Sequence, residues 1–355
     1  MNATTLVVDI LWIEGVLVFI ILAVILGYAF ASRRKARLRE ARMAPARATL
    51  ARHLEDRVLN DAEMANLRRL STPDVIRLFF AVAPSVGMAE REWLRQVAVS
   101  LGLIAKARAR VAAGEWWNRL SGARFLALVG SEPEVMERLS RDEHPDVRAA
   151  SATFLAQYPT PTAIETLIGL LDDGSAIPRF AAKDALMRLG AIASPTIAAR
   201  IADVNDPHAR VLLEIACAAP SHEYLAAATV RLRDDSAEIR SLVARLFRGM
   251  GGAFASGQLT GMLSDVDDLV RESAVEALGF LNHWPSAATV AGRLNDPSSR
   301  VRLAAALALD RFGAPGELFL RRALTRGSDV AVIAARRILD DPARATAPES
   351  VAPFR

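Results

Sequence analysis

The fold is decided by one stretch of sequence, Asn295-Asp296-Pro297-Ser298-Ser299-Arg300-Val301-Arg302-Leu303-Ala304-Ala305-Ala306-Leu307-Ala308-Leu309. Its Asp-Pro pair is typical of a helix start, because the carboxylate caps free backbone N–H groups and proline suits the first turn. The alanine- and leucine-rich remainder favours helix. The stretch therefore predicts a capped α-helix with a Val-Arg pair near its start.

Related copies of this stretch recur along the chain. With the arginine at 302 as the marker, the copies have their markers at 148, 179, 212, 240, 271, 302 and 333, where 212 is leucine and 333 is isoleucine. The intervals are 31, 33, 28, 31, 31 and 31 residues. A nearly fixed period of this length is the sequence signature of a repeat protein.

Each repeat is predicted to contain two helices. The first runs from the Val-Arg pair to a stop such as Gly190, Gly251 or Gly313, and the second is shorter, as in 287–294. Neither helix can bury its apolar stripe within so short a unit, whereas stacking of neighbouring units buries it. The sequence therefore predicts an all-α fold, an α-solenoid over residues 142–341.

The pattern resembles the HEAT-like repeats first associated with phycobilisome lyases. The family-like signature Asp-Pro-x-x-x-Val-Arg-x-x-Ala-Ala-x-Ala-Leu is well matched from Asp296 to Leu309 and partly matched elsewhere. The resemblance implies that first helices line the outer face of the solenoid and second helices line a concave groove, where partners usually bind. It specifies architecture strongly and function hardly at all.

The resemblance also suggests which side chains face a partner. They are polar residues of the predicted second helices, and the candidates for a protein-binding groove are Glu165, Arg200, Tyr224, Gln258, Arg293 and Arg321.

An arginine recurs once in most units, with an aspartate six residues before it. The arginines are Arg148, Arg179, Arg240, Arg271 and Arg302, and the aspartates are Asp142, Asp173, Asp234, Asp265 and Asp296. One interpretation is a basic surface that grips an anionic ligand. The interpretation that we favour is a structural Asp–Arg ladder that ties successive units together, because repetition in nearly every unit is what a structural role requires.

Residues 10–31 are predicted to form a transmembrane helix. They are apolar apart from Glu14, and as a helix they extend over about 33 Å, enough to cross a hydrocarbon core of about 30 Å. Trp12 and Tyr28 suit the two membrane interfaces. A role for Glu14 within the membrane stays open.

A basic cluster follows this segment and consists of Arg33, Arg34, Lys35, Arg37 and Arg39. Positive flanks stay on the cytoplasmic side of a membrane, so residues 1–9 are expected outside and the repeats in the cytoplasm, at the inner membrane. The cluster can also attract anionic lipid headgroups. The alternative to an anchor is a cleaved signal peptide, which the small-residue pattern Ala29-Phe30-Ala31 would fit but the lack of Lys or Arg in residues 1–9 opposes.

Three further segments lie outside the repeats. Residues 32–59 read as a basic helical stalk that Pro45 should kink or interrupt. Residues 60–141 contain bulky aromatic side chains that the repeats lack, and we interpret them as an atypical helical cap on the first repeat, with a separate binding domain as the alternative. Residues 342–355 are rich in Ala and Pro and are expected to form a disordered tail.

No catalytic or cofactor-binding constellation is found in the sequence. The single cysteine, Cys217, lies in an apolar run and is expected to be a small buried hydrophobe rather than a reactive thiol. Of the five histidines only His53 has a potential metal-ligating neighbour at helical spacing, Asp56. The stretch Gly249-Met250-Gly251-Gly252 follows an apolar helix and reads as a helix stop rather than a phosphate loop. We therefore expect no cofactor, no metal and no enzymatic activity.

The charge distribution bears on the partner. The chain has a net charge of +4, but residues 142–341 contain 21 basic against 25 acidic residues, which opposes nucleic-acid binding by the repeats. The leading hypothesis is a membrane-anchored cytoplasmic scaffold or adaptor that binds a protein partner and regulates or localises an enzyme. The alternative is a lyase-like or chaperone-like protein that acts on a cofactor-bearing protein.

Overall fold

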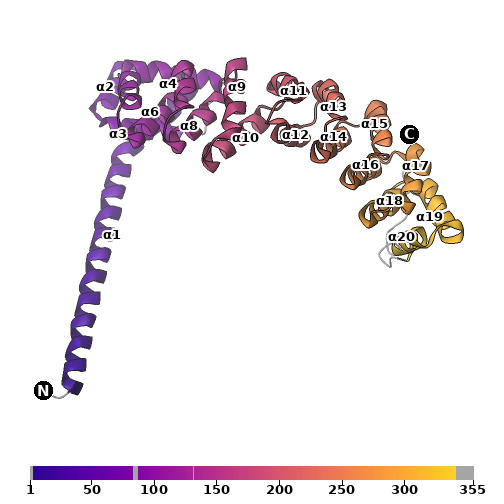
Figure 1. The fold of residues 1–355 in the computed structure, drawn as a ribbon. Helices are drawn as coiled ribbons and strands as arrows, with labels where there is room; N and C mark the ends of the chain where they lie inside the picture. The colour runs from indigo at the N-terminus through magenta and orange to yellow at the C-terminus, as the bar shows by residue number, and fades with distance from the viewer. Residues whose placement is uncertain (1–2, 83–86, 131, 341–355) are drawn as a thin grey trace. The chain divides into compact units, whose positions relative to one another are not determined.

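The computed structural model describes residues 3–82, 87–130 and 132–340, and within these ranges it does not describe the side chains of residues 3–16, 18, 32, 35, 36, 39, 42, 55, 88, 89 and 133. Every regular element of the described residues is a helix (Figure 1). The chain divides into two compact units, Met1–Pro133 and Glu134–Arg355.

The first unit opens with one long helix and continues with five shorter ones. Their bounds are α1 (Ala3–Asp56), α2 (Asp61–Arg69), α3 (Thr72–Val82), α4 (Met88–Ser100), α5 (Leu103–Val111) and α6 (Trp116–Leu128). Pro45 lies inside α1, so the predicted interruption does not occur. Proline removes only one backbone hydrogen bond there, and α1 continues for many residues on both sides.

The predicted membrane segment lies in α1. Its described large apolar side chains are exposed to solvent, among them Phe19, Val24 and Phe30 with exposed fractions of 70%, 65% and 71%. Among the described residues, no helix combines the length and the apolar character that a membrane crossing requires. The part of the prediction that rests on the side chains of residues 10–16 and 18 lies outside the described residues.

The core of the first unit is built from the aromatic and aliphatic residues that distinguish it from the repeats. Phe79 of α3 and Phe125 of α6 are fully buried, with ring centroids 5.6 Å apart. Helices α5 and α6 pack closely where Gly122 faces Ala107, since a Cβ at Gly122 would lie 2.7 Å from the Ala107 carbonyl oxygen.

The turn between α1 and α2 is fixed by a capping box and by His53. The Asn60 side chain accepts a hydrogen bond from the Glu63 N–H, and the Glu63 carboxylate accepts one from the Asn60 N–H. The His53 Nδ1 atom lies 2.8 Å from the Asp56 carboxylate, and Nε2 lies 3.1 Å from that of Glu63. His53 and Asp56 therefore pair at helical spacing, as the sequence suggests, and His53 also joins α1 to α2.

These contacts make the α1–α2 turn sensitive to pH. Hydrogen bonds to Asp56 and then Glu63 raise the pKa of His53 above its ordinary value of 6.5. The His53 hydrogen bond lowers the pKa of Asp56 below 3.8, and the Asn60 N–H and then His53 lower that of Glu63 below 4.5. The contribution of His53 to stability is thus fully present below pH 6.5 and is lost as the pH rises through its raised pKa. The contribution of Asp56 and Glu63 to stability is present above their ordinary pKa values of 3.8 and 4.5. It is lost as the pH falls through their lowered pKa values.

We therefore expect the turn to be most stable between about pH 4.5 and pH 6.5. Amide hydrogen exchange at the α1–α2 turn, corrected for the intrinsic pH dependence of exchange, measures this. Protection should decline above that window in the native chain and should show no such decline in His53→Gln. A decline of equal size in both proteins would show that His53 is not the responsible group.

The second unit is a stack of helix pairs, and every marker of the sequence repeat lies on a first helix, as predicted. The first helices are α8 (Pro145–Leu155), α10 (Ala176–Leu189), α12 (Ala209–Ala218), α14 (Ala237–Met250), α16 (Asp268–Phe280), α18 (Ser299–Arg311) and α20 (Asp329–Leu339). The second helices are α9 (Pro161–Gly169), α11 (Ser194–Ala202), α13 (Leu225–Arg231), α15 (Gly252–Met262), α17 (Ala287–Gly292) and α19 (Ala314–Arg326). Helix α7 (Pro133–Leu139) precedes them, and the 3-10 turns η2 (Leu170–Asp172), η3 (Gly190–Ile192), η4 (His222–Tyr224), η5 (Trp284–Ser286) and η6 (Arg293–Asn295) adjoin the second helices.

Successive first helices pack against one another through small residues. Ala182, Ala274 and Ala305 are fully buried, and a Cβ at Gly279 of α16 would lie 2.8 Å from that of Ala308 in α18. The predicted glycine stops are confirmed, since Gly190, Gly251 and Gly313 end first helices with φ of 50°, 66° and 64°. These backbone angles favour glycine over residues with a Cβ. The second unit is therefore the predicted all-α solenoid.

Candidate functional site

The Asp–Arg ladder joins neighbouring repeats through ion pairs that are buried or partly buried. Arg148 on α8 donates from Nε and Nη2 to the two oxygens of Asp173, at 2.6 and 2.7 Å, and from Nη1 to the Asp142 carbonyl. The aspartate six residues before the arginine thus contributes its carbonyl oxygen, whereas the carboxylate comes from the next unit. The Asp173 carboxylate also accepts the Ser175 N–H and so shapes the start of the next first helix.

The same geometry recurs at two later junctions. Arg240 donates to both Asp265 oxygens at 2.9 and 2.8 Å, and Arg271 donates to both Asp296 oxygens at 2.8 Å. Burial alone would raise the pKa of Asp296, but hydrogen bonds from Arg271 and the Ser298 N–H outweigh it and lower the pKa. The structural interpretation of the ladder therefore agrees with the geometry, because these three arginines are already committed to aspartates of the same chain.

The ladder is interrupted between the second and third repeats. Arg179 donates to the Asp173 carbonyl, but Val204 stands 25 residues later, where the three paired junctions have Asp173, Asp265 and Asp296. Asp206, whose side chain is 1% exposed, pairs instead with Arg200 at 2.5 Å and with His208 at 3.0 Å. The buried Arg231 closes the gap by donating to the carbonyls of Ile201, Asp203 and Val204.

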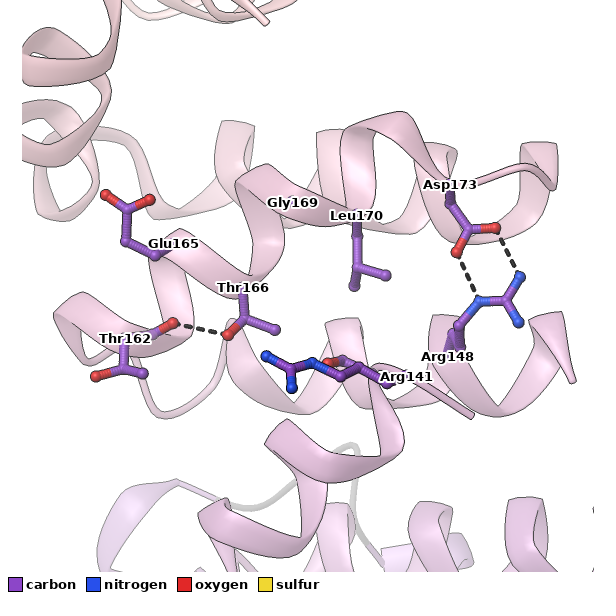
Figure 2. A pocket seen from close by; sticks show the side chains of 9 residues that line it. Arg141, Arg148, Thr162, Glu165, Thr166, Gly169, Leu170 and Asp173 are labelled. Carbon is purple, nitrogen blue, oxygen red and sulfur yellow. Dashed lines mark hydrogen bonds and ion pairs between the residues drawn. The ribbon is translucent and has the colours of Figure 1, made fainter. Parts of the chain in front are cut away.

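A pocket lies beside the Arg148–Asp173 pair and α9 (Figure 2). Its volume is about 580 Å³, and we call it the Glu165 pocket. Thr162, Glu165 and Thr166 reach it from α9, and Arg141 reaches it from the segment before α8. The Arg148–Asp173 pair closes one end. The Thr166 hydroxyl donates its proton to the Thr162 carbonyl at 2.8 Å, so it can only accept a hydrogen bond from a ligand.

Comparison with known proteins identifies the repeat. A model of the HEAT-repeat family matches residues 132–231, 225–310 and 255–340, which together cover more than half of the chain. The chain belongs to the HEAT-repeat family. No curated protein matches its sequence. The HEAT repeats therefore account for the solenoid, and the matched region includes the Glu165 pocket.

The solved structures that match this chain are distant in sequence. The complex of CpcE and CpcF of phycocyanin lyase from Nostoc sp. PCC7120 shares 18% identity, over 67% of this chain and 94% of that chain, with a TM-score of 0.29. Human deoxyhypusine hydroxylase in complex with glycerol shares 16%, over 75% and 97%, with a TM-score of 0.31. Kap121p bound to RanGTP shares 16%, over 78% of this chain but only 35% of that chain, with a TM-score of 0.47.

Five of the six sequence-predicted groove residues reach the surface, and Tyr224 is buried. Glu165 and Arg321 are exposed, and Arg200, Gln258 and Arg293 are half-buried. Arg200 lies 3.6 Å from Glu165, Arg293 lies 3.6 Å from Asp296, and Arg321 donates to Glu317 at 2.7 Å. Of the six, Glu165 alone lines the Glu165 pocket.

Tyr224 is not at the surface, and its assignment to the groove is wrong. It is 1% exposed, and its hydroxyl accepts a hydrogen bond from Ser194 at 3.0 Å. Tyr224 ends the 3-10 turn η4 and stands immediately before α13, where its side chain is buried inside the HEAT repeats. Its polar atom is satisfied there, which makes burial of the large ring favourable.

Sequence reasoning missed Arg141 as a pocket residue. Arg141, Asn295 and Arg326 each stand seven residues before a marker, and each lines a pocket beside the second helices. This shared position is the sequence signal that points toward them, although Asp172, Asn205, Arg233 and Ser264 occupy it in the other repeats without lining either pocket.

Cys217 has the environment of an unreactive thiol. Burial raises its pKa to about 11, and its Sγ atom lies 3.5 Å from the Leu242 carbonyl oxygen. Because the thiolate is the reacting form, we expect thiol reagents at neutral pH to react about 100-fold more slowly with Cys217 than with an unshifted thiol. Following the reaction with and without urea measures this. Fast labelling of the folded protein would contradict the expectation.

Proposed function

We propose that the chain is a membrane-anchored scaffold whose HEAT repeats bind a protein partner along the second helices, with a binding rather than a catalytic role. The observation that carries the proposal is the Glu165 pocket, where Arg141, Thr162 and Glu165 present polar groups that the ladder does not use. The first helices are more fully committed to one another through the ladder and through small buried residues.

The anchor part of the proposal rests on α1. Large apolar side chains from Leu17 to Phe30 are exposed on all described faces of this helix, which is costly in water and favourable in lipid. Exposed Arg33, Arg34 and Arg37 follow directly. We propose that residues 10–31 cross the inner membrane, with residues 1–9 outside and the repeats in the cytoplasm.

The anchor is tested by placing charge in the apolar segment. In Val24→Arg/Ile25→Arg, insertion should be opposed by about 3 kcal/mol for each arginine. The native chain should remain in membranes after carbonate extraction, and the variant should move to the supernatant. Full release of the native chain would refute the anchor.

The binding role is tested by co-purification of the full chain from mild-detergent membranes. Thr162→Lys/Glu165→Arg changes exposed side chains at the pocket, and Thr153→Lys changes an exposed threonine on the first helix α8. We expect recovery of a specific partner to fall about tenfold in the pocket variant, a loss of about 1.4 kcal/mol, and to be unchanged in Thr153→Lys. Equal recovery by all three proteins would contradict the proposal.

A further inference from the structure

A second pocket lies at the other end of the row of second helices. Its volume is about 290 Å³, and it lies between α17 and α19. We call it the Arg322 pocket. Small residues form much of its lining, and the larger side chains that reach it are Leu294, Asn295, Phe319, Arg322 and Arg326. None of its lining residues is acidic.

The two arginines of the Arg322 pocket lie one turn apart on α19 and are exposed. Neighbouring arginines have acidic partners, since Arg321 donates to Glu317 and Arg293 lies beside Asp296. Across the described part of the chain, the structure shows no such partner for Arg322 or Arg326. Two cationic side chains thus face one small pocket without neutralising charge.

The charge of the repeats is also uneven along the stack. Residues 142–310 contain 21 acidic and 15 basic residues, whereas residues 311–341 contain four acidic residues and six arginines. The Arg322 pocket therefore belongs to a short basic region that follows a longer acidic one. A long polyanion would meet repulsion from the acidic repeats, whereas a short acidic segment would meet only the basic end.

We propose that the Arg322 pocket binds an acidic peptide segment of the protein partner. Carboxylates of the segment accept hydrogen bonds from Arg322 and Arg326, an arrangement that guanidinium groups favour. The Phe319 ring and the small lining residues contact the aliphatic part of the same side chains. This inference rests on the proposed function and specifies the chemistry of the partner.

Binding of a fluorescein-labelled glutamate-rich peptide to the detergent-solubilised full chain tests the proposal, with fluorescence anisotropy as the readout. A peptide with glutamine in place of glutamate is the ligand control. Arg322→Gln/Arg326→Gln removes the two charges, and Arg336→Gln/Arg337→Gln removes two exposed charges of α20 that do not line the pocket. Gly292→Leu fills the pocket without changing charge, since open space surrounds a Cβ at Gly292.

We expect the glutamate peptide to bind at least about tenfold more tightly than the glutamine peptide. The Arg322/Arg326 variant and Gly292→Leu should each weaken its binding by about tenfold or more, and the Arg336/Arg337 variant by less than about twofold. An equal loss of peptide affinity in the two double variants would show that the effect comes from general electrostatics, and it would overturn the proposal. Stronger competition by an oligonucleotide or by phosphatidylserine vesicles than by unlabelled glutamate peptide would also overturn it.

This outcome is separable from that of the proposed function. If the glutamate peptide does not bind but partner recovery still depends on Thr162 and Glu165, only the Arg322 pocket proposal fails. If partner recovery is insensitive to Thr162→Lys/Glu165→Arg, the proposed function fails whatever the peptide does.

Discussion

Replacing Asp296 with alanine is expected to lower the free energy of unfolding of the repeats by about 3 kcal/mol. The Asp296 side chain is fully buried, and it accepts two hydrogen bonds from Arg271, whose side chain is 9% exposed. The substitution leaves the Arg271 charge buried without its carboxylate and also removes the acceptor of the Ser298 N–H. Urea unfolding of the full chain, followed by circular dichroism, measures the loss.

Arg302→Ala is the matched control for this substitution. Arg302 occupies the same repeat position as Arg271 and donates to the carbonyls of Asp296 and Pro297, but Gly327 stands where the next carboxylate would be. The described residues give Arg302 no ion pair to lose, so this variant should be destabilised by only about 1 kcal/mol. Hydrogen exchange should place the larger loss of protection in α16 and α18 of Asp296→Ala. Equal destabilisation by both variants would show that the inter-repeat ion pair contributes nothing beyond the carbonyl contacts.

Gly316→Ala is expected to have a comparably large effect, about 3 kcal/mol of destabilisation. Gly316 is buried in α19, and an added Cβ would lie 1.8 Å from the Leu309 carbonyl oxygen and 2.9 Å from the Leu309 Cα. Because the obstructing atoms belong to the backbone of α18, a rotamer change cannot relieve the contact. The pair α18–α19 would have to separate.

Gly257→Ala provides the comparison for this glycine. Gly257 lies within α15, and nothing lies within 4 Å of an added Cβ. Alanine should therefore stabilise that helix by about 0.5 kcal/mol through its higher helix propensity. The shift in the thermal unfolding midpoint of each variant measures these two changes in stability. A Gly316→Ala protein as stable as the native chain would mean that α18 and α19 are less closely packed than described.

The repeat architecture could be predicted from sequence because its period is determined by covalent spacing. Markers 31 residues apart give first helices in register, and the stops at Gly190, Gly251 and Gly313 follow from backbone conformation alone. Both signals are local, so they can be recognised without knowledge of the packing.

The pairing within the ladder could not be read from the same spacing. Arg148, Arg240 and Arg271 each have one aspartate six residues before them and another 25 residues after them, and a 31-residue period makes the two separations equivalent in sequence. The structure shows that the earlier residue contributes its carbonyl and the later one its carboxylate. This distinction depends on how two units stack.

The surface assignments were less predictable for a related reason. Tyr224 was assigned to the groove because it is polar and lies near a second helix, yet the Ser194 hydroxyl of the preceding repeat satisfies its polar atom inside the stack. The Arg322 pocket depends on small residues at Ala291 and Gly292, and a space left by missing side chains has no marker in a single sequence.

Site-specific photo-crosslinking tests whether the second helices hold the partner. A photoreactive residue is placed at Glu165 in the pocket and, in a second protein, at Thr153 on the first helix α8, and cells producing each full chain are irradiated. We expect a discrete protein adduct from position 165 that is absent from position 153. An adduct formed from Thr153 but not from Glu165 would place the partner on the first helices and contradict this expectation.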